Sequence, residues 1–386
     1  MRVVNIGINL VPEAGGIARA VTYWWRAQTE LGHKTNIVSF WRSGLYEPEE
    51  GPCPECRYVR VPNVPVLRSY YWWPSGYLDG MRALLDGANS VVIHGLFFHP
   101  GVLAAAWARR LGIPYILVVH GSLDPWVFTY HRWRKKAWMW RAGNRLLKGA
   151  AAVVYSTQAE RQKASGWIGS RDYVIHWPVP YVPDYDKREA SRRVRELHRL
   201  APGSRIALFC GRIHPVKRPL ETIRAFAASA PLDWVLLLVG PLTQEIPRAR
   251  LEAACGASGG RCIYAGPAFG EALSDYYRAA ELFILFSHKE NFSHSTAEAL
   301  AHGVPVLITA TVDLSEELAE SSAACAFIAR ESGSTWMEDG LRAALCLSPQ
   351  DLAIMGARGR EWIRTHLSFS NFCARLSEIF RLCGSG

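Results

Sequence analysis

The chain has 386 residues, of which 49% are apolar and 20% charged, the proportions of a folded globular protein rather than of a disordered one. No apolar run approaches the roughly 18 residues that cross a bilayer, which excludes a membrane-spanning helix as the organising feature. The formal net charge of +10 calls for an anionic partner, which leaves phosphorylated substrates, acidic lipids and nucleic acids as candidates.

The first half of the chain alternates short apolar strands with helical patterns, which is typical of βαβ units around a parallel sheet. The expected strands are residues 3–9, 35–40, 90–94, 115–119, 151–155 and 173–176. The expected helices are residues 17–31, 100–111 and one that begins with the capping box Thr157-Gln-Ala-Glu160. We therefore predict an α/β domain over residues 1–180.

A proline-rich segment, residues 177–184, interrupts this alternation. Prolines remove hydrogen-bond donors and hold their neighbours extended, so we expect a hinge there. The charged residues 187–199 that follow are expected to form a solvated helix. Residues 181–204 are thus predicted to be a linker.

The alternation resumes in the second half and predicts another α/β domain over residues 205–365. The expected strands are residues 206–210, 234–239, 262–264, 282–286 and 304–309. A helix at 219–228 begins with a proline at the favoured first position, and residues 348–382 are expected to be helical.

The segment from Phe286 to Val306 carries the most specific pattern for chemistry. It runs from an apolar strand through a polar turn into a helix. Two carboxylates, Glu290 and Glu298, would not share one face of a helix at about 100° per residue, so we expect Glu290 in the turn and Glu298 in the helix. Between them, Ser293, Ser295 and Thr296 are good N-cap residues, and the free backbone N–H groups at a helix N-terminus suit an anion. A ligand with hydroxyls at both ends and phosphate between them, such as a nucleotide sugar, fits this pattern.

Two cations, a glycine pair and a histidine precede this segment in turns that follow predicted strands. Arg212 and Lys217 suit phosphate oxygens, and the alternative is two exposed surface cations. At Gly15 and Gly16 the missing Cβ lets the backbone approach phosphate, although a plain tight turn explains the same residues. His120 follows a buried strand and is expected to face the ligand crevice, with a purely structural histidine as the alternative.

Taken in order, these motifs resemble the retaining glycosyltransferases of family 4, which adopt the GT-B fold of two Rossmann-like domains facing a central cleft. The resemblance covers most of the chain and includes two further turns, Val239-Gly240-Pro241 and Gly266. It implies an α/β GT-B architecture in which the N-terminal domain lies on the acceptor side and the C-terminal domain binds the nucleotide sugar. It also implies that a C-terminal helix, residues 366–386, packs back on the N-terminal domain.

The resemblance also implies roles for individual residues. Glu290 would face the transferred sugar and His120 would touch it near the reaction centre, while Arg212 and Lys217 would neutralise the leaving diphosphate. Glu298 would hold the ribose hydroxyls. The remaining donor-binding residues would be Gly15, Gly16, Gly240, Gly266, Asn291, Phe292 and Ser293. The alternatives are a helix-capping role for Glu298 and a solvated loop charge for Glu290.

The function that the resemblance predicts is transfer of a sugar from a nucleoside-diphosphate sugar to a hydroxyl acceptor with retention of anomeric configuration. The expected acceptor is a glycan or a lipid-linked intermediate, and no nucleic acid partner is expected. Two alternatives stay open at this point. One is a GT-B nucleotide-sugar epimerase or hydrolase, and the other is a non-catalytic basic protein that binds membranes or nucleic acid.

Residues 130–148 combine seven Lys/Arg with three tryptophans. Basic residues beside interfacial aromatics suit an anionic membrane surface, and the same mixture suits nucleic acid. An ordinary helix with its aromatic side in the core is an equal alternative. We expect a cytoplasmic protein, with peripheral placement on the inner membrane face as a further hypothesis.

Two motifs of metal sites are set aside. Cys53-Pro-Glu-Cys56 lacks a second pair at zinc-finger spacing. Asp184-Tyr-Asp186 has the Asp-x-Asp form of metal-dependent glycosyltransferases, but it lies in the predicted linker rather than at a strand end. We therefore expect no metal and no cofactor besides the donor substrate.

Overall fold

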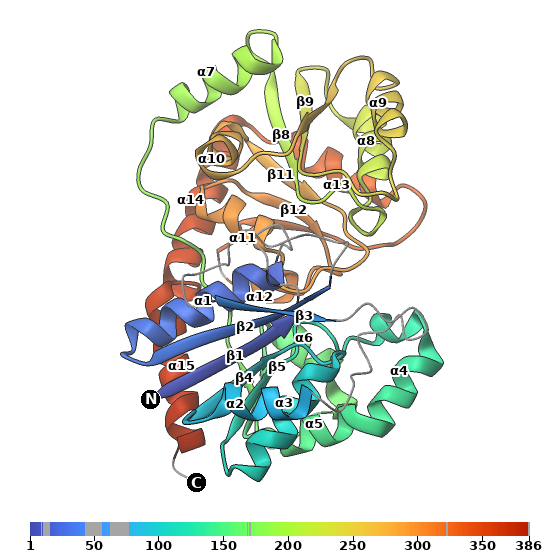
Figure 1. Cartoon of the computed structure of the whole chain (residues 1–386). Helices are drawn as coiled ribbons and strands as arrows, with labels where there is room; N and C mark the ends of the chain where they lie inside the picture. Colours follow the sequence, from blue (N-terminus) through green and yellow to red (C-terminus); the bar gives the residue numbers. More distant parts are fainter. Residues whose placement is uncertain are drawn as a thin grey trace. The chain divides into compact units, whose positions relative to one another are not determined.

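The computed structural model describes residues 1–8, 10, 16–42, 56–61, 77–167, 169, 171–321 and 323–384. The chain divides into two compact units. Unit 1 comprises Met1–Pro178 and Phe369–Gly386, and unit 2 comprises Val179–Ser368. Each unit contains one parallel sheet flanked by helices (Figure 1).

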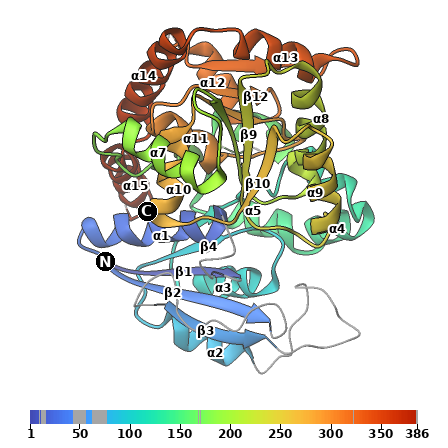
Figure 2. The ribbon, with the colours of Figure 1, turned by 90° about the horizontal axis from the view of Figure 1, so that it is seen from above.

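The sheet of unit 1 has seven strands in the order β3-β2-β1-β4-β5-β6-β7, all parallel. Figure 2 shows β1, β2 and β3 side by side in that order. The strands are β1 (Arg2–Ile8), β2 (Lys34–Arg42), β3 (Cys56–Val61), β4 (Ser90–His94), β5 (Tyr115–Val118), β6 (Ala152–Tyr155) and β7 (Asp172–Val174). Every residue of β4, β5 and β6 is buried, because helices cover both faces of a parallel sheet.

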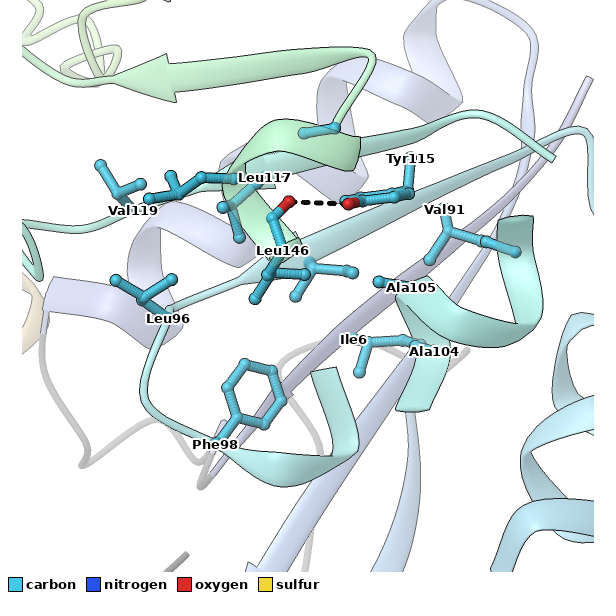
Figure 3. Packing of buried hydrophobic residues seen from close by; sticks show 14 of the residues in the cluster. Ile6, Val91, Leu96, Phe98, Ala104, Ala105, Tyr115, Leu117, Val119 and Leu146 are labelled. Carbon is cyan, nitrogen blue, oxygen red and sulfur yellow. Dashed lines mark hydrogen bonds between the residues drawn. The ribbon is translucent and has the colours of Figure 1, made fainter. Parts of the chain in front are cut away.

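The α-helices of unit 1 are α1 (Gly16–Glu30), α2 (Tyr77–Leu85), α3 (His99–Arg110), α4 (Arg132–Trp138), α5 (Asn144–Gly149), α6 (Gln158–Lys163) and α15 (Phe369–Gly384). Shorter turns are the 3-10 turns η3 (Pro125–Thr129) and η5 (Ser165–Trp167) and the π-helical turn η4 (Met139–Gly143). The last helix, α15, packs on α1. Figure 3 shows the core between the sheet and α3, where the Tyr115 hydroxyl donates to the carbonyl oxygen of Leu146 at 2.6 Å.

The sheet of unit 2 has six parallel strands in the order β10-β9-β8-β11-β12-β13. They are β8 (Arg205–Cys210), β9 (Trp234–Val239), β10 (Cys262–Gly266), β11 (Leu282–Leu285), β12 (Val306–Thr309) and β13 (Ala326–Ala329). The helices are α7 (Lys187–His198), η6 (Pro215–Lys217, a 3-10 turn), α8 (Pro219–Ser229), α9 (Arg248–Gly256), α10 (Gly270–Ala279), α11 (His294–Ala301), α12 (Leu314–Glu320), α13 (Trp336–Leu345) and α14 (Pro349–His366).

Both sheets reverse their strand order next to the first strand. In unit 2 the chain proceeds from β8 outward to β9 and β10, and then returns to β11 on the other side of β8. The equivalent reversal in unit 1 lies between β1 and β4. Open α/β sheets bind ligands outside the carboxyl ends of the strands at such a reversal. The turns after β8 and β11, which carry the predicted cations and carboxylates, therefore meet at the expected place.

The predicted α/β class with two parallel sheets is confirmed. Sequence analysis did not predict β3, α2, α12, β13 or α13. Residues 181–204, predicted to be a linker, lie within unit 2, where α7 packs on α10 and Arg193 makes two hydrogen bonds of 2.7 and 2.6 Å to Asp275. None of the described helices is both long and apolar enough to cross a membrane.

Candidate active site

Two glycines shape the carboxyl ends of β8 and β9. Gly211 has φ 146°, and a Cβ there would lie 3.0 Å from Cε of Lys217. Gly240 has φ 145°, and a Cβ there would lie 2.0 Å from the carbonyl oxygen of Gly211. Since L side chains rarely adopt these backbone angles, both positions favour glycine. Because Gly211 has no Cβ, the Lys217 side chain can lie across the carboxyl end of β8.

Lys217 and Glu290 form an ion pair at this end of the sheet. Their side chains are only 12% and 19% exposed. The N–H of Glu290 donates to the carbonyl oxygen of Thr311 at 3.3 Å, and its own carbonyl oxygen accepts from the N–H of Asp313 at 3.0 Å. The N–H of His288 donates to the carbonyl oxygen of Val216 at 2.8 Å, which ties the β11 turn to η6. Backbone hydrogen bonds from three turns thus fix a cation beside a carboxylate where β8 meets β11.

A second cation, Arg218, anchors this turn to the body of unit 2. It has φ 51° and is buried, and its guanidinium donates to both carboxylate oxygens of Glu331 at 2.8 and 3.0 Å. The guanidinium also lies 5.3 Å from the ring centroid of Trp336. These hydrogen bonds hold the pKa of Glu331 below its usual value. Burial, followed by the charge of Arg218, lowers the pKa of the neighbouring His288.

The N-terminus of α11 begins three residues after Glu290. Ser293, its N-cap residue, is buried in the left-handed region at φ 55°. Its hydroxyl lies 2.8 Å from the hydroxyl of Thr296 and makes no cap to the helix backbone. A non-glycine residue in this conformation costs about 1–3 kcal/mol and is found preferentially at functional sites. The positive end of the helix dipole thus follows Glu290 closely in the chain.

A hydrogen bond from a buried tyrosine sets the orientation of Glu298. The Tyr277 hydroxyl donates to Oε2 of Glu298 at 3.0 Å, and the Tyr277 ring stacks on His302 with centroids 5.0 Å apart. Burial raises the pKa of Tyr277 well above its ordinary value, so its hydroxyl stays a donor. Glu298 is half-buried on α11, and the hydrogen bond from Tyr277 orients its carboxylate.

In unit 1, His120 lies two residues after the last residue of β5, in a left-handed conformation with φ 48°. Its Nε2 lies 3.2 Å from Nδ1 of His94, at the end of β4, and its ring stacks on Trp177 with centroids 5.5 Å apart. Burial lowers the pKa of His120 to about 3 and that of His94 well below its ordinary value. Both imidazoles are therefore neutral near pH 7.

The turn that carries His120 is held by a buried carboxylate of α6. Glu160 accepts from the N–H of Gly121 and from both the N–H and the hydroxyl of Ser156, the latter two at 2.6 and 2.7 Å. The predicted cap at Thr157 is confirmed, since its hydroxyl accepts from the N–H of Glu160 at 3.0 Å. The Glu160 side chain, however, extends beyond the N-terminus of α6. It stabilises two turns, the one that contains Gly121 and the one that contains Ser156.

With this geometry in place, comparisons with known proteins become informative. Residues 15–180 match the family described as Glycosyl transferase 4-like domain, and residues 204–343 match Glycosyl transferases group 1. The chain is 25% identical to a GDP-mannose-dependent alpha-mannosyltransferase of Mycobacterium tuberculosis, over 80% of this chain and 78% of that protein. It is 26% identical to a GDP-mannose-dependent alpha-(1-6)-phosphatidylinositol dimannoside mannosyltransferase of the same species, over 84% of both chains.

The chain belongs to the family 4 glycosyltransferases. Among solved structures, sucrose-phosphate synthase from Thermosynechococcus elongatus covers 99% of this glycosyltransferase and 98% of its own chain, with a TM-score of 0.77 and 18% identity. The two units are thus the two Rossmann-like domains of the GT-B fold, as predicted. The predicted class of enzyme, a transferase that uses a nucleotide sugar, is confirmed.

The predicted site residues of the glycosyltransferase do not all lie together. Lys217, Glu290 and Gly240 lie at the β8–β9–β11 ends, whereas Arg212 is exposed and its guanidinium makes no hydrogen bond to any residue that the structure describes. Gly266 ends β10, where its carbonyl oxygen accepts from Gly240 N–H at 2.9 Å.

The other predicted donor-binding residues surround α11 or begin α1. Phe292 is buried and Asn291 is half-buried, so both residues would contact a ligand chiefly through their backbone groups. Gly16 is the exposed first residue of α1, and Gly15 lies outside the described residues.

Sequence analysis missed four supporting residues: Asn5, His94, Arg218 and Tyr277. His94 satisfies the same rule that selected His120, a histidine at the carboxyl end of a buried strand, and applying the rule twice would have found it. Arg218 follows Lys217 directly but gives no signal of burial. The role of Tyr277 depends on a contact between α10 and α11 that no spacing in the sequence indicates.

The two aspartates of the Asp-x-Asp motif have structural partners. Asp184 pairs with Arg360 at 2.9 Å, and Asp186 caps α7 by accepting from the N–H of Arg188 at 2.8 Å. Of the CxxC pair, Cys56 lies in β3 and Cys53 lies outside the described residues.

Proposed function

We propose that this glycosyltransferase moves a hexose from a nucleoside-diphosphate sugar to a hydroxyl of a glycan or lipid-linked acceptor, with retention of anomeric configuration and without a metal ion. The observation that carries the proposal is the Lys217–Glu290 pair at the reversal between β8 and β11. Both relatives named above are GDP-mannose-dependent, and one acts on a phosphatidylinositol dimannoside, a glycolipid.

In the proposed reaction the bond between the anomeric carbon and the diphosphate breaks as the acceptor oxygen bonds to the same face of the sugar. The acceptor proton passes to the departing phosphate oxygen. Lys217 and Arg212 neutralise the charge that develops on the diphosphate, the task that a divalent metal performs elsewhere. Glu290 accepts hydrogen bonds from hydroxyls of the transferred sugar, and neutral His120 accepts another.

The rest of the nucleotide is proposed to bind along the ends of the unit 2 strands. Glu298, whose Oε2 accepts from Tyr277, accepts from the ribose hydroxyls as well. Backbone groups of Asn291, Phe292 and Ser293, at the positive end of α11, face the phosphates. Gly240, Gly266 and the Gly15–Gly16 turn allow the ligand to approach the backbone closely.

A panel of UDP-, GDP- and ADP-sugars tests the proposal through thermal stabilisation, because a bound donor stabilises by mass action. The donor that stabilises most should be hydrolysed slowly alone and consumed faster when glycolipid or glycan acceptors are added, with or without EDTA. Consumption that yields an isomerised or hydrolysed sugar at the same rate with every acceptor would instead establish the epimerase or hydrolase alternative.

We also propose that residues 130–148 place the enzyme on an anionic membrane surface. Trp133 in α4 and Trp140 in η4 are 71% and 81% exposed. Trp138 is buried, and its indole N–H donates to the carbonyl oxygen of Leu96 at 3.2 Å, which anchors the segment to unit 1. The alternative that the tryptophans of this segment lie in the core therefore holds for one of the three, Trp138. The segment carries no carboxylate to offset its seven cations.

Cosedimentation with vesicles separates the possibilities. Phosphatidylglycerol vesicles should retain the enzyme and phosphatidylcholine vesicles should not, and the double variant Trp133→Ala/Trp140→Ala should lose binding. Leu232→Ala, at an equally exposed apolar residue of unit 2, is the matched control. Retention by single-stranded DNA in place of vesicles would favour the nucleic-acid alternative and contradict the membrane proposal.

A further inference from the structure

Four polar side chains form a hydrogen-bonded chain through the core of unit 1. Asn5 and Gln28 exchange two hydrogen bonds, of 2.7 and 3.2 Å, between β1 and α1. Oδ1 of Asn5 lies 3.3 Å from Nε2 of His94, and Nδ1 of His94 lies 3.2 Å from Nε2 of His120. Asn5, Gln28 and His94 are almost completely buried. Because an unsatisfied polar atom in such surroundings is costly, the direction of every bond in the chain is constrained.

The orientation of the Asn5 amide is settled by a neighbouring carbonyl. The reciprocal pairing with Gln28 is equally good if both amides are turned over. The carbonyl oxygen of Asn36, however, lies 3.5 Å from Nδ2 of Asn5. At that distance the hydrogen bond is weak, but an amide oxygen in the same place would face another oxygen and be repelled. The amide nitrogen therefore faces Asn36 and the amide oxygen faces His94.

This orientation propagates to His120. The oxygen of Asn5 can only accept, so Nε2 of His94 carries the hydrogen. His94 is neutral, which leaves a lone pair on its Nδ1, and Nε2 of His120 must then be the donor between the two rings. Neutral His120 thus has its hydrogen on Nε2 and a lone pair on Nδ1. That Nδ1 makes no hydrogen bond within the part of the chain that the structure describes.

We propose that the Gln28–Asn5–His94 chain fixes the tautomer of His120, so that Nδ1 is presented as a hydrogen-bond acceptor for a hydroxyl of the transferred sugar. Asn5 and His94 are then positioning residues that act through His120 and touch no substrate. The sugar contact rests on the proposed function, whereas the tautomer does not. The arrangement selects a ligand group that donates, such as a hydroxyl, over one that can only accept, such as an ether oxygen.

The tautomer is measured directly on the full-length protein labelled with ¹⁵N-histidine. Long-range ¹H–¹⁵N correlation spectra distinguish protonated from unprotonated ring nitrogens, and His120→Gln identifies the signals of His120. The expected result is a hydrogen on Nε2 and none on Nδ1 at pH 7. A hydrogen on Nδ1 in the unaltered protein, or an equal mixture, overturns the inference whether or not any variant folds.

Asn5→Leu then removes the acceptor that directs His94. The His120 signals should move toward a mixture of tautomers, while Asn5→Asp, which still only accepts at that position, should retain tighter control. Unchanged His120 signals in Asn5→Leu would contradict the relay. His131→Gln, at an exposed histidine of the same unit, is the matched control.

Deoxy analogues of the donor identified by the thermal panel test the sugar contact. One analogue should lose about tenfold in kcat/KM with the unaltered enzyme, since one hydrogen bond is lost. Asn5→Leu should lose about the same factor with the parent donor and discriminate little against that analogue. A full loss in both enzymes would contradict the contact. No turnover of any donor, together with the expected tautomer, would refute the proposed function and leave the relay standing.

Discussion

The two units build their ligand-facing ends from opposite kinds of chemistry. Unit 2 uses formal charges, Lys217 with Glu290 and Arg218 with Glu331, and leaves the first pair partly in contact with solvent. Around His120 unit 1 uses neutral side chains, with one buried carboxylate, Glu160, behind the turn, and it buries His94 so deeply that protonation is suppressed. Burying an ion costs several kcal/mol unless it is paired or hydrogen-bonded, as Arg218 and Glu160 are, whereas neutral amides and imidazoles need only satisfied hydrogen bonds.

The contrast indicates a division of labour. A diphosphate with several negative charges needs cations, and an uncharged sugar needs directional donors and acceptors. In unit 2 the loss of a charged side chain should therefore lower turnover most, whereas the stability of unit 1 should depend most on pH. Four experiments follow, of which the loss of Lys217 and the pH dependence of unit 1 test that division directly.

The largest effect is expected for Lys217→Ala. Removing a preorganised cation from a developing negative charge should lower kcat about 10²–10³-fold, measured as donor turnover. Arg224→Ala, which removes an exposed cation of α8 that pairs with Glu221 at 3.7 Å and donates to the Leu220 carbonyl oxygen at 3.3 Å, should leave turnover unchanged. A loss of less than about tenfold in Lys217→Ala would remove the main support for a diphosphate site at β8.

Gly240→Ala should destabilise unit 2 by about 2–4 kcal/mol, because the new Cβ meets the Gly211 carbonyl oxygen and the backbone angle disfavours an L side chain. Urea unfolding measures the change. Gly256→Ala, in α9 with nothing within 4 Å of the new Cβ, should be neutral or stabilising by about 0.4–1 kcal/mol. Equal midpoints for the two variants would show that the approach of β8 to β9 is not tight.

The stability of unit 1 should fall with acidity. His120 and His94 have folded pKa values below the unfolded value of about 6.5, so the unfolded chain binds more protons than the native chain below that pH. Stability is therefore full above about pH 6.5 and falls as the pH falls toward about 3, by at most about 1.4 kcal/mol per pH unit for each histidine. His120→Gln should reduce the slope between pH 6.5 and 5. An unaltered slope would contradict suppressed protonation of His120.

The smallest effect is expected for Tyr277→Phe. Loss of the hydrogen bond to Glu298 should raise the Kd of GDP or UDP about three- to tenfold in calorimetry, with little change for the 2′-deoxy nucleotide. Tyr276→Phe is the matched control, since that hydroxyl pairs with Nε2 of His198 at 2.7 Å instead. Equal losses for ribo- and deoxynucleotides would show that Glu298 does not bind the ribose.

Whether a feature can be predicted from the sequence depends on whether the residues that form it lie close together in the chain. Strand and helix periodicity, the reversal turns and the carboxylate pair are local patterns, and the fold and the region of the site follow from them. The contacts that orient the site are not local. Tyr277 on α10 donates to Glu298 on α11, and Asn5 on β1 is linked to His120 through His94 on β4. The helix at 187–198 was predicted with nearly the same bounds, and most of its charged residues are exposed as expected, but its contact with α10 through Arg193 and Asp275 joins residues far apart in the chain and was not predicted.

The carboxylate of Glu160 has a practical consequence for anyone altering sugar preference. It accepts backbone hydrogen bonds from the turn after β5 and from the turn after β6, so those two turns are mechanically coupled through one side chain. A loop graft that exchanges residues 120–122 and displaces the N–H of residue 121 removes one of the three hydrogen bonds to this buried carboxylate, while the two from Ser156 remain. A graft should therefore carry residues 156–160 along with the histidine turn.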